Sequence, residues 1–194
     1  PGFRASRSSR VIPIVECHLP ERELNELWPN LPAVPAGSRL ILRSGTRTVA
    51  WREAPVRQRS RGRSAERGEP VPLGAPISRG EAVPPVEFDL LCGKFRVSPG
   101  SFFQVNTPLA GQLAEAVCRQ VEGGLPEEGR QAAVLDLYCG VGLFSRALAP
   151  RVGSVMGVEL SPTACADFRY NLRGQDNARL APGAVEEILP RLDL

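Results

Sequence analysis

The stretch "VLDLYCGVGLFSRALA", residues 134–149, decides the fold of the C-terminal half of the chain. It runs from an apolar strand into a turn with two glycines and then into a helix. A second strand and helix follow in "VGSVMGVEL" (152–160) and "SPTACADFRYNL" (161–172), and "DNARLAPGAVEEILPRLDL" (176–194) predicts one more strand and a short helix. Alternating strands and helices predict a parallel α/β sheet with right-handed crossovers.

The glycine turn is typical of a site for a nucleotide-like ligand. Gly140 and Gly142 let the backbone come close to a ligand. Asp136 stands just before the turn, where its carboxylate would repel a pyrophosphate and favour a cationic sulfonium. Glu159 ends the second strand and suits ribose hydroxyls in either cofactor class. The pattern favours S-adenosyl-L-methionine over NAD, since Ser145 replaces the third glycine of a dinucleotide fingerprint. Glycines that serve only strand-to-helix packing remain the alternative.

Upstream of this turn, the sequence predicts a strand and a long helix. "FDLLCGKFRVSPGSFFQVN" (88–106) has strand character and ends in a polar elbow, and "TPLAGQLAEAVCRQVEGG" (107–124) predicts a helix. Apolar residues recur every four positions in this helix and predict one buried stripe: Leu109, Leu113, Val117 and Val121.

The N-terminal part of the chain is basic. Residues 1–67 hold thirteen Arg against six Glu, whereas residues 68–194 hold eleven basic and fifteen acidic side chains. This balance suits a surface that contacts RNA, attached to a separate ligand-binding unit; a coding sequence that favours Arg codons is the alternative. We expect a strand in 10–19, a helix in 20–28, a hairpin in 38–51 around Ser44-Gly45, and a mobile basic loop in "VRQRSRGRSAERGEP" (56–70).

Several protein classes are disfavoured. No run of eighteen apolar residues is present and the N-terminus has no signal-peptide core, so no membrane partner is expected. The five cysteines lie far apart with no CxxC pair, and their odd number and the helix-like setting of several favour a reducing, cytoplasmic setting.

Three segments together resemble the class I RNA 5-methyluridine (uracil-C5) methyltransferase family: "FRVSPGSFFQVN" (95–106), "VLDLYCGVGLFS" (134–145) and "GVEL" (157–160). Members of this family transfer a methyl group from S-adenosyl-L-methionine to C5 of uridine in tRNA or rRNA. More weakly, "VIPIVECHL" (11–19) resembles the start of the family's inserted RNA-binding subdomain.

The resemblance implies two domains. Residues 1–87 would be a partial, small α+β RNA-binding insert with a mobile Arg-rich loop at about 53–85, and residues 88–194 the front of an incomplete Rossmann-like methyltransferase sheet. RNA, either tRNA or rRNA, is then the expected partner, and a monomer is expected for the full-length protein.

The resemblance also implies residue roles. Gln104 resembles the glutamine that contacts the methionine end of the cofactor, with Phe102 beside it. Tyr138 resembles the aromatic residue that contacts the cofactor, and Glu159 the ribose acid. The cofactor-binding residues predicted from the turn and the resemblance together are Phe102, Gln104, Asp136, Tyr138, Gly140, Gly142 and Glu159.

No catalytic residue is predicted in this chain. Family members add a cysteine thiolate to uracil C6, which makes C5 nucleophilic, and a base then removes the C5 proton. The DPPR-type loop and the nucleophilic cysteine of the family have no counterpart here, and Cys139 is interpreted as a packing residue. We therefore expect a fragment that lacks both the N-terminal part and the catalytic C-terminal region, binds S-adenosyl-L-methionine weakly and is inactive alone. An incomplete gene, a truncated product and a decayed paralogue all stay open.

No metal is expected in this chain. By position, Cys17 resembles a cysteine that completes an iron–sulfur cluster in some members, but three upstream partners are missing. Two other functions remain open. A catalytically dead RNA-binding module would bind RNA through residues 57–67 and ignore S-adenosyl-L-methionine. A nicotinamide oxidoreductase is disfavoured by Asp136. The target RNA and uridine are not encoded in any pattern found.

Overall fold

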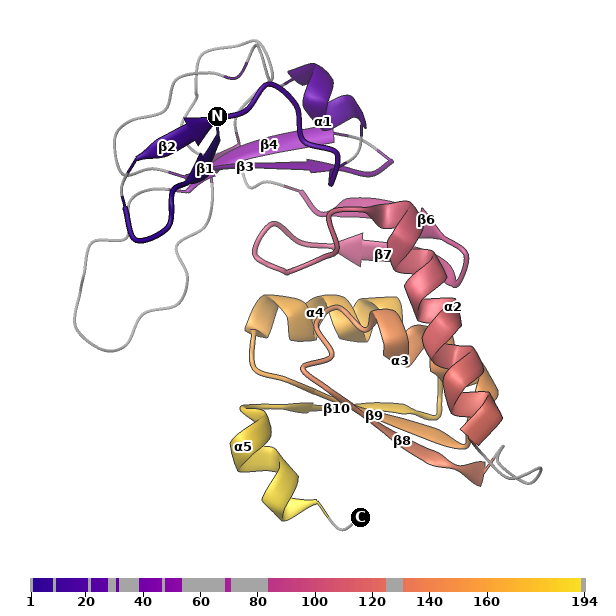
Figure 1. Cartoon of the computed structure of the whole chain (residues 1–194). Coiled ribbons are helices and arrows are strands. Elements are labelled where there is room, and N and C mark those ends of the chain that lie inside the picture. The colour runs from indigo at the N-terminus through magenta and orange to yellow at the C-terminus, as the bar shows by residue number, and fades with distance from the viewer. Residues whose placement is uncertain are drawn as a thin grey trace. The chain divides into compact units, whose positions relative to one another are not determined.

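The protein divides into two units, Pro1–Val83 and Pro84–Leu194 (Figure 1). The computed structural model describes residues 2–8, 10–20, 22–27, 31, 39–46, 48–53, 69–70, 84–124 and 131–192. The predicted basic loop, including residues 57–67, lies almost wholly outside the described residues. Each unit is described by itself.

Antiparallel strands dominate the described part of the first unit. β1 (Gly2–Arg4) pairs with β2 (Val11–Pro13), and the predicted hairpin is confirmed as β3 (Arg39–Ser44) and β4 (Thr48–Glu53), with β5 (Glu69–Pro70) added to β4. The predicted helix is confirmed as α1 (Arg22–Leu27), which buries Leu24.

The second unit contains a three-stranded parallel sheet in the order β10-β9-β8. Its strands are β8 (Ala133–Leu137), β9 (Ser154–Glu159) and β10 (Ala178–Pro182), and the predicted parallel pairing is confirmed. The helices are α3 (Leu143–Leu148), α4 (Pro162–Asn171) and α5 (Val185–Ile188), with short 3-10 turns at Ala149–Arg151 and Leu189–Arg191. In Figure 1, α3 and α4 lie on one face of the sheet and α5 on the other.

The segment before the long helix has the predicted strand character, and it forms a hairpin of two strands. β6 (Val86–Leu90) pairs antiparallel with β7 (Gly93–Val97), with Phe88 opposite Phe95. Phe103, further along the chain, packs against both rings at centroid distances of 4.8 and 6.1 Å. The hairpin thus has its own aromatic core, and its two strands lie on the far side of α3 and α4 from the sheet (Figure 1).

Helix α2 (Thr107–Gly124) has the predicted bounds, but the predicted buried stripe is wrong. Leu109 and Leu113 are 56% and 46% exposed. The buried residues are instead small ones: Ala110, Gly111, Ala114 and Cys118. Small side chains allow α2 to pack closely against α3 and β6, where a Cβ on Gly111 would lie 3.5 Å from the Leu91 backbone nitrogen.

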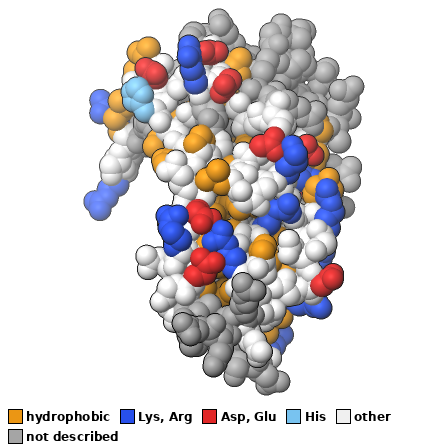
Figure 2. All heavy atoms as spheres, turned by 90° about the vertical axis from the view of Figure 1, so that its right-hand side faces the viewer, with side chains coloured by type: hydrophobic (Ala, Val, Ile, Leu, Met, Phe, Trp, Pro, Cys, Tyr) orange, Lys and Arg blue, Asp and Glu red, His pale blue; other side chains and the backbone are white. Residues whose placement is uncertain are grey.

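Figure 2 views the side on which α2 lies and shows hydrophobic side chains among charged ones of both signs. Arg151, after α3, forms ion pairs there with Glu115 and Glu122 of α2, at 2.7 and 3.4 Å. None of the helices in the described ranges is long and apolar enough to cross a membrane.

Candidate functional site

The two glycines of the turn after β8 have different physical roles. Gly142 has φ 87°, and a Cβ there would lie 2.5 Å from Leu172 Cδ1 and 2.9 Å from the Phe168 ring. Gly140 also has a positive φ, of 56°, but a Cβ there would meet no atom within 4 Å. Gly142 is therefore required by packing, whereas Gly140 faces open space beside the carboxyl end of the sheet.

Glu159 lies against this turn. Its carboxylate accepts hydrogen bonds from the Gly140 backbone N–H at 3.0 Å and from the Ser161 backbone N–H at 2.7 Å. An ionised carboxylate has about four lone-pair sites, so Glu159 keeps acceptor capacity for further donors. The end of β9 thus brings a half-buried negative charge next to the open space at Gly140.

Asp136 supports the turn from inside. Its Oδ2 accepts hydrogen bonds from the Ser145 backbone N–H at 3.0 Å and from Ser145 Oγ at 2.6 Å. Burial raises the pKa of Asp136, against the lowering effect of these two bonds. Because Asp136 accepts the Ser145 N–H, this backbone amide in the first turn of α3 is already hydrogen-bonded. A dinucleotide site would need free amides there to bind its pyrophosphate. The direct contact of Asp136 with a cofactor stays a prediction.

Tyr138 stands at the rim of the same turn. It is a non-glycine residue with φ 58°, an uncommon conformation that is enriched at functional sites. The residue is 67% exposed, and its hydroxyl donates to Glu186 Oε1 of α5 at 2.7 Å, which raises the pKa of Tyr138. Sequence reasoning did not identify Glu186. The available signal was an acidic residue in the first turn of the helix predicted after the third strand.

Phe102 and Gln104 are exposed on the irregular segment between β7 and α2. The beginning of this segment is anchored on α4 by Asp167, a fully buried residue that sequence reasoning missed. Asp167 accepts hydrogen bonds from the Ser98 backbone N–H (2.7 Å), Ser98 Oγ (2.8 Å) and Ser101 Oγ (2.6 Å). The segment with both predicted residues therefore starts beside α4, the helix that follows Glu159.

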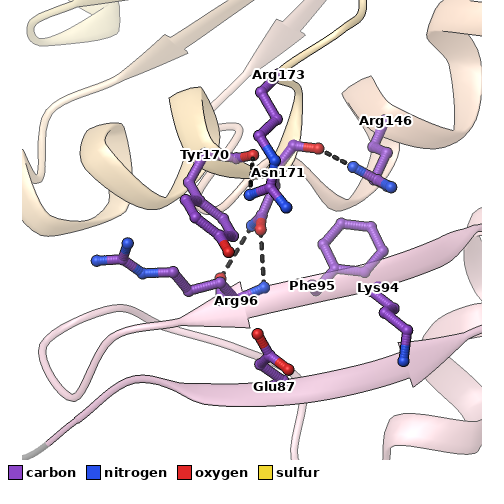
Figure 3. A pocket seen from close by; sticks show the side chains of 8 residues that line it. All are labelled: Glu87, Lys94, Phe95, Arg96, Arg146, Tyr170, Asn171 and Arg173. Carbon is purple, nitrogen blue, oxygen red and sulfur yellow. Dashed lines mark hydrogen bonds between the residues drawn. The ribbon is translucent and has the colours of Figure 1, made fainter.

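Asn171, also buried and also missed, joins the hairpin to the glycine turn, and Figure 3 shows its bonds to Arg96 of the hairpin. Its side chain accepts from the Arg96 backbone N–H at 2.7 Å and donates to the Arg96 and Val141 carbonyls at 3.0 and 2.9 Å. Asp167 and Asn171 are four residues apart, hence on one face of α4. This polar pair at helical spacing, among apolar neighbours, was the signal that could have revealed them.

The cysteines provide no reactive group in this region. Burial raises the pKa of Cys139, and the charges of Asp136 and Glu159 raise it further, so Cys139 stays a thiol at neutral pH. Cys139 packs with Phe168 and Leu172 in the core. Within the described residues, no three His, Cys, Asp or Glu side chains gather as a metal site. Cys17 is half-buried, and its backbone N–H and carbonyl bond the Asn25 side chain.

The sequence profile of the tRNA (uracil-5-)-methyltransferase family matches residues 92–189, about half of the chain. These residues include the β7 strand, the Asp167 and Asn171 anchors, and the glycine turn with Glu159. The chain belongs to this family.

Its relatives include an uncharacterized RNA methyltransferase of Streptomyces coelicolor, 35% identical over 98% of this chain and 43% of that protein. The human tRNA (uracil-5-)-methyltransferase homolog A is 36% identical over 66% of this chain and 20% of its own length. Among solved structures, the tRNA (uracil-54, C5)-methyltransferase of Pyrococcus abyssi, in complex with S-adenosyl-L-homocysteine, matches 65% of this chain and 28% of that one at 25% identity and a TM-score of 0.42. The chain spans less than half the length of these curated relatives.

Proposed function

We propose that this chain forms the cofactor-binding front of an S-adenosyl-L-methionine-dependent RNA methyltransferase that acts on C5 of uridine. The family membership supports RNA methylation as the activity. The human relative's name supports tRNA as the substrate, and rRNA remains the alternative. We also propose that residues 1–87 are the partial RNA-binding insert, because the basic excess of the chain lies there.

The observation that carries the proposal is the open space at Gly140, bounded by the Glu159 carboxylate. A nucleoside needs a backbone without a side chain to approach and an acceptor pair for its ribose diol, and this turn provides both. The first turn of α3 instead bonds Asp136, which disfavours a diphosphate at that place. The residues present therefore fit an adenosine with a cationic substituent better than a dinucleotide.

Each residue has a defined task in this arrangement. Glu159 accepts hydrogen bonds from the ribose hydroxyls, and the hydrogen bonds that it accepts from the Gly140 and Ser161 amides hold its carboxylate in place. Tyr138, fixed by Glu186, offers an exposed ring for an apolar contact, and Gln104 is assigned to the methionine end. When bound, S-adenosyl-L-methionine supplies an electrophilic methyl group.

Activation of uracil requires a thiolate that adds to C6. Burial raises the pKa of four of the five cysteines, which keeps them protonated: Cys92, Cys118, Cys139 and Cys165. We assign no catalytic role to these four.

Calorimetry with S-adenosyl-L-methionine, S-adenosyl-L-homocysteine and NAD tests the cofactor assignment. We expect the chain to bind the first two with modest affinity and NAD not measurably. Glu159→Gln keeps the size of the side chain but removes its charge and one acceptor, so binding should fall by about tenfold or more. Glu187→Gln, at an exposed acid of α5, is the matched control and should bind as the wild type does.

Binding of NAD in preference to both sulfur compounds would overturn the cofactor assignment. Binding that is equal in the Glu159→Gln and Glu187→Gln variants would remove Glu159 from the site. Submicromolar affinity for S-adenosyl-L-methionine would contradict the expected weak binding.

A further inference from the structure

A basic pocket lies between the β6–β7 hairpin and the helices α3 and α4, and its lining includes Asn171 (Figure 3). It has a volume of about 240 Å³. Four cationic side chains line it, Lys94, Arg96, Arg146 and Arg173, against the single acid Glu87. No role in cofactor binding was assigned to any of these residues.

Two of the arginines are gathered around one aromatic ring. The guanidinium carbon of Arg173 lies 3.8 Å from the centroid of the Tyr170 ring, and that of Arg96 lies 4.8 Å from it. The ring attracts each cation, but it leaves their mutual repulsion in place. An anion bound in the pocket would offset the positive charge of both groups.

The acids near these cations neutralise them only in part. Lys94 forms an ion pair with Asp89 at 2.8 Å, and the Nε of Arg96 forms one with buried Asp167 at 3.4 Å. Arg146 and Arg173 donate instead to backbone carbonyls, those of Asn171 and Tyr170. Within the part of the chain that the structure describes, neither forms an ion pair with a carboxylate, so the pocket keeps an excess of positive charge.

The pocket is held in shape by the protein itself. Asn171 bonds both backbone groups of Arg96, which fixes β7 against α4. Arg146 lies 5.5 Å from the Phe95 ring centroid, beside Gly93, where a Cβ would come within 2.9 Å of its guanidinium. The Arg146 guanidinium, confined in this way, loses little freedom when a ligand binds in the pocket.

We propose that this pocket binds a phosphate of the RNA backbone, with Arg173 and Arg96 as the direct donors. This inference rests on the proposed function, because it takes RNA as the partner. Arginine forks donate two parallel hydrogen bonds to a phosphate, and Tyr170, which is 37% exposed, offers a ring edge for a neighbouring base or sugar. The pocket is a positioning contact that carries no sequence information.

Arg173→Gln in the complete chain tests the proposal, with an unmodified tRNA transcript as the probe. Arg173 is exposed, so the variant should fold. Arg179→Gln is a closely matched control, because Arg179 is also exposed and also donates to the carbonyl three residues before it. We expect the affinity for the transcript to fall about tenfold in Arg173→Gln and to stay unchanged in Arg179→Gln.

The salt dependence provides a second readout. Loss of one phosphate contact should reduce the slope of log K against log salt by about 0.7 to 0.9. Arg173→Lys, which keeps the charge without the fork, should retain the slope and lose part of the affinity. S-adenosyl-L-methionine binding should be the same in all variants, because neither Arg173 nor Arg179 is among the residues assigned to the cofactor.

If Arg173→Gln and Arg179→Gln both keep the RNA affinity and the salt slope of the wild type, the pocket assignment is overturned and the proposed function is left standing. Equal losses in both variants would also overturn it, since they would indicate general attraction by positive charge. Absence of RNA binding by the wild-type chain would overturn the RNA assignment and the pocket together.

Discussion

Replacing each glycine of the turn by alanine separates the packing role from the ligand role. Both positions have a positive φ, so an alanine at either one costs about 1–2 kcal/mol of folding free energy from backbone strain. At Gly142 the added Cβ also overlaps Leu172 and Phe168, at 2.5 and 2.9 Å, inside the buried core. Such overpacking adds about 1–3 kcal/mol.

Gly142→Ala should therefore lower the free energy of unfolding by about 2–5 kcal/mol, a large share of the roughly 5–15 kcal/mol typical of a domain. Gly140→Ala should lower it by only about 1–2 kcal/mol. Its Cβ enters the space proposed for the nucleoside, so the affinity for S-adenosyl-L-methionine should fall by about tenfold or more in a protein that is still folded.

Urea unfolding monitored by circular dichroism gives the two stabilities, and calorimetry on the folded variants gives the affinities. Equal destabilisation by the two substitutions would refute the packing argument at Gly142. Unchanged cofactor affinity in folded Gly140→Ala would show that the nucleoside does not use the space beside that residue.

Two further substitutions test the supports of the site. Because burial raises the pKa of Asp136, its charge opposes folding once the pH rises above the ordinary Asp range of about 4, so Asp136→Asn should gain stability relative to the wild type as the pH rises from there toward neutrality in urea unfolding; a difference that stays constant from about pH 4 upward would contradict this. Asp167→Ala removes the acceptor of three hydrogen bonds from Ser98 and Ser101 and the carboxylate beside Arg96, so it should cost about 3–5 kcal/mol of unfolding free energy and weaken S-adenosyl-L-methionine binding; a loss below about 1 kcal/mol would show that Asp167 is not the anchor of the 98–101 segment.

The sequence was sufficient for the elements whose residues carry strong local signals. The strand and helix alternation after residue 132 is confirmed, and Ser161 caps α4 by accepting from the Ala164 backbone N–H. The hairpin at Ser44-Gly45 is confirmed because turn residues and flanking apolar residues agree.

Packing direction could not be predicted in the same way. Helix α2 has two residue sets at four-residue spacing, the large Leu109 and Leu113 and the small Ala110 and Ala114, and periodicity alone does not say which set faces a neighbour. The small set is buried because α3 and β6 approach closely there, a fact of tertiary structure.

The sequence also could not predict which groups the side chains of the site contact. Asp136 was recognised as part of the turn, but only the structure shows its carboxylate bonded to Ser145. Asp167 and Asn171 escaped attention because their partners, Ser98, Arg96 and Val141, lie between 30 and 75 residues away in the sequence.

The most direct test of the central claim is a crystal structure of this chain soaked with S-adenosyl-L-methionine. The account predicts that the ribose hydroxyls lie within hydrogen-bond distance of Glu159, with the nucleoside over Gly140 and its ring against Tyr138. Ligand density elsewhere on the protein, with the Gly140 turn left free, would contradict it.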